Sequence, residues 1–111
     1  MGIADKKYIN LEEGLHRVGN NEVLYKKLLG KFSVDIQGLD ASISNGDYNV
    51  AEQIVHAAKG VSANLSLIAF YDSSVILMEQ LRNGGIPDQF CVTTFEMVYA
   101  ETVAAIQTYL N

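Results

Sequence analysis

Apolar residues recur at intervals of three and four along most of this chain, and that interval leaves few folds open. It matches the 3.6-residue turn of an α-helix and not the two-residue alternation of a half-buried strand. The clearest repeat comprises Leu24, Leu28, Phe32, Ile36, Leu39 and Ile43. Residues such as Val92, Thr93 and Val103 favour strands by intrinsic propensity, but they lie within the same spacing and no tight hairpin turn divides them. We therefore expect an all-α protein.

Residues that typically begin and end helices divide the sequence into five predicted helices. Asn10 followed by Glu13 is typical of a capping box, and Pro87-Asp88 of the start of a helix. Gly19, Asn45-Gly46 and Asn83-Gly84-Gly85 supply three of the ends. The predicted helices run from Asn10 to Gly19, from Asn20 or Asn21 to Asn45-Gly46, from Asp47 to about Asn64, from Ser66 to about Arg82 before Asn83-Gly84-Gly85, and from Pro87-Asp88 to the end. The last helix should bury Cys91, Phe95, Val98, Thr102, Ile106 and Tyr109.

Four long amphipathic helices joined by short turns favour one architecture. We expect an antiparallel up-down-up-down four-helix bundle, with the short additional N-terminal helix lying across one end. The chain has 111 residues, of which 49% are hydrophobic, enough to enclose one core. The prediction is a single domain over residues 1–111, compact from about residue 8.

Composition excludes several classes of function. The net charge of -5 argues against nucleic acid as a partner, because phosphate backbones are bound by clustered lysine and arginine. No apolar run approaches the ~20 residues of a membrane span. One cysteine and the lack of a secretory leader favour a reducing, cytoplasmic setting, and we expect a monomer. Six of the eight basic residues lie at or before Lys31, so that only Lys59 and Arg82 follow.

His56 is the strongest candidate for chemistry. On the helix that carries it, one apolar face is formed by Ala51, Ile54, Val55, Ala58, Ser62 and Leu65. His56 falls on the opposite, solvent-facing side, with Lys59 and Gly60 about one turn further on. Glycine inside a helix costs about 1 kcal/mol relative to alanine, which suggests that another molecule must approach closely at Gly60.

Simpler interpretations of these residues remain open. An exposed histidine can be inert, and Lys59 can be an ordinary solubilising residue. Metal binding is poorly supported, because His16 is on a different helix and Glu52 is the sole carboxylate one turn from His56. We expect no metal site, a core position for Cys91, and a surface position for His16 near the end of the first helix.

The segment around His56 resembles the histidine-containing phosphotransfer (HPt) domains of multistep two-component phosphorelays. That family has a His-x-x-Lys-Gly core, small residues and an Asn-hydrophobic-small turn. Here these read His56-Ala57-Ala58-Lys59-Gly60-Val61-Ser62-Ala63-Asn64-Leu65-Ser66, with further similarity at Ile9 to Leu15, Tyr25 to Phe32, Phe70, Ser74 and Leu77. Ala63 and Ser66 stand where glycine is usual, and Ala58 where leucine is frequent.

The resemblance implies a function for each matched residue. His56 would accept a phosphoryl group from a receiver-domain phospho-aspartate and donate it to another receiver, and Lys59 would stabilise the phosphoryl oxygens. Glu52, Gln53, Gly60 and Ala63 would form the docking face. The receivers of a hybrid histidine kinase or a response regulator would be the partners, and they would hold the magnesium ion; this chain would bind no cofactor.

With no glycine-rich phosphate loop, the chain should be a phosphohistidine carrier and not an autonomous kinase. Two questions stay open. The first is whether the chain transfers phosphate at all, because the alternative is a non-catalytic helical adaptor that binds a receiver without phosphotransfer. The spacing also leaves undecided which flank of the second helix borders His56, the one with Lys31, Asp35 and Gly38 or the one with Ser33, Gln37 and Asp40.

Overall fold

The computed structural model describes residues 6–82 and 85–111, and all regular secondary structure in this part is helical. The all-α prediction is therefore confirmed. The helices are α1 (Leu11–Arg17), α2 (Glu22–Gly30), α3 (Ile36–Ser44), α4 (Tyr48–Leu65), α5 (Ile68–Arg82) and α6 (Gln89–Leu110).

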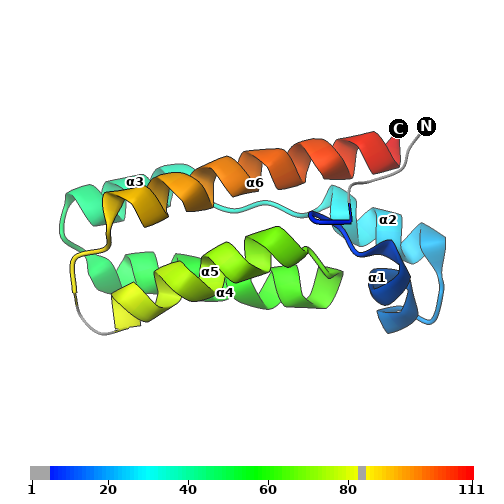
Figure 1. The fold of residues 1–111 in the computed structure, drawn as a ribbon, viewed down its shortest axis with the longest axis horizontal. Helices are drawn as coiled ribbons and strands as arrows, with labels where there is room; N and C mark the ends of the chain where they lie inside the picture. Colours follow the sequence, from blue (N-terminus) through cyan, green and yellow to red (C-terminus); the bar gives the residue numbers. More distant parts are fainter. Residues whose placement is uncertain (1–5, 83–84) are drawn as a thin grey trace.

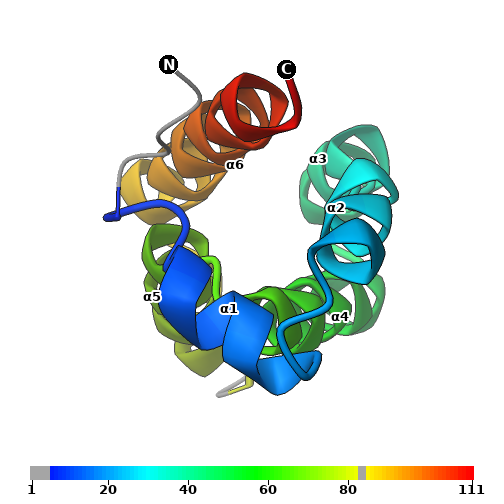
Figure 2. The same ribbon diagram turned by 90° about the vertical axis from the view of Figure 1, so that its right-hand side faces the viewer.

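The long helices follow the long axis of a molecule that measures 41 × 23 × 19 Å, and α1 lies across one end (Figure 1). α4, α5 and α6 alternate in direction, α3 packs beside α4, and α2 lies toward the end of the molecule that α1 occupies (Figure 1). The most extensive contact is between α4 and α5, followed by α5 with α6 and α3 with α4. Viewed along the long axis, α6, α5, α4 and the α2–α3 pair surround the core (Figure 2).

Side-chain caps explain where four of the helices begin. Asn10, Asn21, Asp35 and Asp47 each accept a hydrogen bond from the backbone N–H three residues later, at the start of α1, α2, α3 and α4. Such a bond satisfies one of the N–H groups that the first turn leaves unpaired. Of the two asparagines predicted to begin the second helix, Asn21 is the cap, because Asn20 has the left-handed φ of 61°.

The predicted helix from Asn20 or Asn21 to Asn45-Gly46 is wrong, because residues 31–35 separate it into α2 and α3. The break lets Phe32 contact Phe70 and Tyr99, with ring centroids 5.7 Å apart in each pair. The Val34 N–H donates to the Tyr99 hydroxyl at 3.1 Å. The Val34 N–H thus has a partner in α6, and the N–H groups of Lys31, Phe32 and Ile36 donate to nearby backbone carbonyls.

The break also changes which side of α2 faces the core. Tyr25 and Leu29 are buried, whereas the predicted Leu24 and Leu28 are 39% and 37% exposed. The buried positions are one residue later than predicted, because the break at residues 31–35 interrupts the repeat that joins Leu24 and Leu28 to Leu39 and Ile43. Leu39 of that repeat is fully buried and Ile43 packs against the core.

The core is centred on aromatic residues from several helices. Phe70 of α5 and Phe95 of α6 are fully buried, with ring centroids 4.8 Å apart. Along α6, the predicted Phe95, Thr102 and Ile106 are buried. The same predicted face also includes three residues that are only partly buried, Cys91, Val98 and Tyr109. Val92, which was not predicted to face the core, is buried.

Ser66 was expected to begin the fourth helix, but it ends α4. Its φ of 58° and ψ of 44° are left-handed, and its N–H donates to carbonyl groups of the last turn. α5 begins two residues later, at Ile68, and ends at Arg82 as predicted. The predicted stop at Asn83-Gly84 lies outside the described residues.

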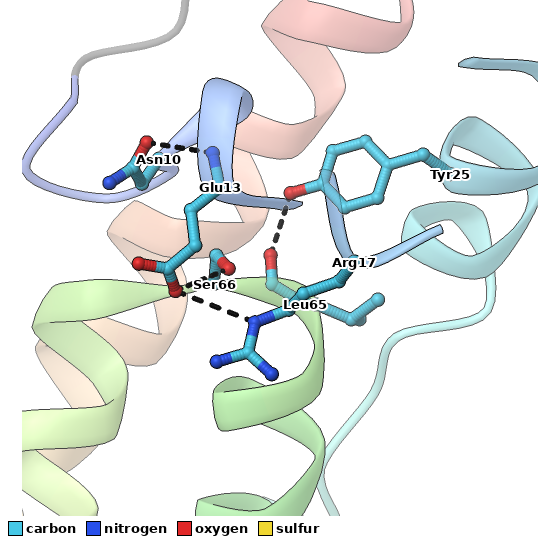
Figure 3. Close-up of polar contacts among 6 residues, drawn as sticks. All are labelled: Asn10, Glu13, Arg17, Tyr25, Leu65 and Ser66. Carbon is cyan, nitrogen blue, oxygen red and sulfur yellow. Dashed lines mark hydrogen bonds and ion pairs between the residues drawn. The ribbon is translucent and has the colours of Figure 1, made fainter. Parts of the chain in front are cut away.

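A group of polar contacts joins α1 and α2 to the end of α4 (Figure 3). The buried Tyr25 hydroxyl donates to the Leu65 carbonyl at 2.6 Å, and the Ser66 hydroxyl donates to the Glu13 carboxylate at 2.8 Å. Glu13 also pairs with Arg17. A Cβ atom at Gly14 would collide with the Tyr25 ring, so this glycine permits the close approach of α1 and α2. These contacts fix the end of α4 nine residues beyond His56.

Within the described part of the chain, no helix combines the length and apolar character needed to cross a membrane.

Candidate functional site

α4 holds His56 on its solvent-facing side. The opposite side is buried through Ala51, Val55, Ala58, Ser62 and Leu65, as predicted, and Ile54 is partly buried. His56 itself is exposed. Among the described residues, none forms a hydrogen bond or ion pair with its ring. The imidazole is therefore accessible to a reacting molecule.

Lys59 and Gly60 follow His56 at one-turn spacing. Lys59 is half-buried and Gly60 is exposed. A Cβ atom at Gly60 would meet nothing within 4 Å, so packing inside this chain gives no reason for glycine there. On an α-helix Lys59 lies about 4.5 Å further along the axis than His56, within reach of a group attached to the ring.

The remaining predicted docking residues lie on the same helix at mixed depth. Glu52 and Ala63 are half-buried, and Gln53 is exposed. Glu52 and Gln53 share a groove with His56, whereas Gly60 and Ala63 do not line it. The predicted docking face therefore extends over about three turns of α4, with His56 near its middle.

A groove of about 550 Å³ separates the exposed edges of α4 and α5 beside His56. Its lining consists of Asn49, Glu52, Gln53, His56, Met78 and Arg82. Arg82 is exposed and forms no ion pair with any described carboxylate. The sequence indicated Arg82 only as one of two cations beyond Lys31, because its position depends on how α5 packs against α4.

A second hollow, of about 310 Å³, lies on the other side of α4. It is mainly apolar and is lined by Lys31, Phe32, Ser33, Val34, Asp35, Ile54, Ala57, Ala58 and Val61. The segment of residues 31–35 forms one wall. Residues of both predicted flanks line this hollow, Lys31 and Asp35 from one and Ser33 from the other, because they lie on a non-helical segment.

The other candidate residues lie elsewhere. His16 is exposed in the last turn of α1, as expected. Cys91 is half-buried and its sulfur accepts a hydrogen bond from Gln80 at 3.1 Å, so it is at the edge of the core and not within it. Across residues 6–82 and 85–111, no three His, Cys, Asp or Glu side chains gather as a metal site would require.

The shifted pKa values belong to groups outside the His56 surface. Burial, and then the nearby Tyr109 and Glu13, raise the pKa of Tyr25 to about 12. Burial and the neighbouring Asp40 carboxylate raise the pKa of Glu96, and burial and Glu22 raise the pKa of Tyr109. These groups bear on stability and not on chemistry at His56.

Comparison of the chain with protein-family models, curated protein sequences and solved structures found no match. Function must therefore be argued from the residues and their arrangement. An exposed imidazole with an unshared electron pair and a lysine one turn away can act as a nucleophile toward an electrophilic phosphorus.

Proposed function

We propose that this chain is a histidine phosphotransfer module in which His56 carries the phosphoryl group. The observation that supports this most directly is an exposed, unpartnered His56 with Lys59 one turn away and open space at Gly60. The proposed architecture is an antiparallel up-down-up-down four-helix bundle, in which α2 and α3 together form the first helix and α1 is the short additional one.

Transfer begins with the neutral form of the His56 imidazole, in which one ring nitrogen carries the electron pair needed for attack. One ring nitrogen attacks the phosphorus of a receiver's aspartyl phosphate. The new N–P bond forms as the P–O bond breaks, and that electron pair leaves with the aspartate carboxylate. The imidazolium then releases the proton of its other nitrogen to water. The reverse sequence delivers the phosphoryl group to the next receiver.

Lys59 and the open surface have separate functions in this proposal. The ammonium group stabilises the phosphoryl oxygens by charge-assisted hydrogen bonds. Gly60 and Ala63 leave room for the receiver, while Glu52 and Gln53 contact its rim. Because phosphoryl transfer depends mainly on positioning and charge stabilisation, the receiver would provide the magnesium ion and this monomeric, cytoplasmic chain would provide the nucleophile.

The proposal is tested by incubating the protein with a radiolabelled phospho-receiver. We expect label on the chain that is labile in acid and stable in alkali, and we expect its loss in His56→Gln. His16→Gln is the matched control, because it removes the other exposed histidine. Since His56 is on the surface, His56→Gln should change the free energy of unfolding by no more than about 0.5 kcal/mol.

Two results would count against the proposal. Equal labelling of wild type and His56→Gln would place the phosphoryl group elsewhere. Binding of a competent receiver without any label would instead favour the non-catalytic adaptor.

A further inference from the structure

The phosphoryl group on His56 would have two neighbouring surfaces of different character. The hollow beside residues 31–35 is mainly apolar and has Ala57 but not His56 in its lining, whereas the α4–α5 groove includes His56 itself. A dianionic phosphoryl group loses much of its hydration on an apolar surface and is therefore disfavoured there. It should lie over the α4–α5 groove.

Arg82 is the single cation in the lining of that groove. It is exposed in the last turn of α5 and has no carboxylate partner among the described residues, so no ion pair must be broken before it binds an anion. Guanidinium groups bind phosphoryl oxygens in a bidentate manner, which a lysine cannot do. Lys59 does not line the groove, so the two cations would approach the phosphoryl group from different directions.

We propose that the α4–α5 groove is the binding site for the phosphoryl group and that Arg82, opposed by Glu52, sets the lifetime of the phosphohistidine. This inference rests on the proposed function of His56. Arg82 binds the phosphoryl oxygens, and Glu52, one turn before His56 in the same groove, repels them.

The two residues should affect hydrolysis in opposite directions. The N–P bond breaks most readily when the ring holds a second proton, since neutral imidazole is then the leaving group and water takes the phosphoryl group. The Arg82 cation lowers the pKa of the phosphorylated ring, and the Glu52 carboxylate raises it. Arg82 should therefore slow the loss of phosphate, and Glu52 should accelerate it.

The test uses phosphoramidate as the donor, which transfers its phosphoryl group with release of ammonia. The half-life of the phosphohistidine and the pKa of its ring are followed by ³¹P NMR. Arg82→Gln should shorten the half-life roughly three- to tenfold, Arg82→Lys should restore part of it, and Glu52→Gln should lengthen it. Lys27→Gln, which removes an exposed cation on α2, is the charge control and should resemble the wild type.

The outcomes separate this inference from the proposed function. If the wild type acquires no phosphohistidine from phosphoramidate or a phospho-receiver, both are overturned. If wild type and Arg82→Gln are phosphorylated and lose phosphate at the same rate, the role of Arg82 is overturned while that of His56 stands. Should Arg82→Gln unfold, Glu52→Gln decides: a half-life no longer than that of Lys27→Gln would refute the charge balance in the groove.

Discussion

At the scale of single residues, Gly60 allows the requirements of the fold to be tested separately from the proposed docking of a receiver. A Cβ atom there would meet nothing, and Gly60 lies inside an α-helix. Alanine should therefore stabilise the protein by about 0.5–1 kcal/mol, because it restricts the unfolded chain. The midpoint of urea unfolding measures this change, and a loss of stability would mean that the site is packed more closely than described.

A bulky side chain at the same position should have a different effect. Gly60→Trp should leave helix content unchanged by circular dichroism but slow phosphoryl transfer from a receiver by roughly one to two orders of magnitude, through misplacement of the reacting groups. Transfer from phosphoramidate, which needs no docking, is the control. Equal rates of transfer from the receiver in wild type and variant would contradict a docking role.

The face on which His56 lies could be predicted from the sequence, because the position of a residue around a helix depends only on local spacing. The buried Val55 and Ala58 on one side and the exposed His56 on the other were both expected. Arg82 could not be assigned in the same way. Its place beside His56 depends on the packing of α5 against α4, which no local pattern specifies.

At the scale of helices, Asp40 of α3 and Glu96 of α6 form a pair of neighbouring carboxyl groups. Burial and the nearby Asp40 raise the pKa of Glu96, so the folded state favours its protonated form. The free energy of unfolding should therefore fall as the pH rises from the ordinary pKa of a glutamate to the raised pKa of Glu96. Above that pH the loss should be constant.

Glu96→Gln should consequently stabilise the protein at pH 7, by a few tenths of a kcal/mol, about the size of an exposed charge interaction. The advantage should disappear in acid, where Glu96 is already neutral. Thermal unfolding at pH 7 and pH 4 measures both. Glu79→Gln, on the exposed side of α5, controls for net charge, and an equal gain from it would contradict a specific effect of Asp40.

The separation of α2 from α3 shows where prediction from local spacing failed. The sequence between Leu24 and Ile43 has a nearly continuous helical repeat, although Asp35 within it caps the start of α3. The decisive contacts join Phe32 to Phe70 and Tyr99, which are distant in sequence. Tertiary packing outweighed helix propensity at this point.

At the scale of the whole molecule, the Tyr25 hydroxyl ties α2 to the end of α4 and should make stability depend on pH. Its pKa is raised to about 12 in the folded state, against about 10 for an exposed tyrosine. The resulting contribution to the free energy of unfolding is fully present below pH 10. It is lost as the pH rises from 10 to 12, because over this range the tyrosine of the unfolded chain loses its proton before that of the folded chain does.

Tyr25→Phe should therefore have two measurable effects. At pH 7 it should cost about 1–2 kcal/mol, since the Leu65 carbonyl loses its buried donor. Between pH 10 and 12 its unfolding midpoint in urea should change less than that of the wild type. Tyr71→Phe is the control, because Tyr71 of α5 is only partly buried and is not one of the groups that raise the pKa of Tyr25. Parallel pH profiles for wild type and Tyr25→Phe would contradict this role for the buried phenol.

The non-helical link at residues 31–35 has a consequence for how such a molecule can change over evolution. Inserting one residue into a continuous helix rotates every later side chain by about 100° around the axis. An insertion between Val34 and Asp35 would alter this non-helical link without rotating α3 about its axis, and Phe32 could keep its contacts with Phe70 and Tyr99. The wall of the apolar hollow can thus change in shape while the helices on either side keep their buried faces.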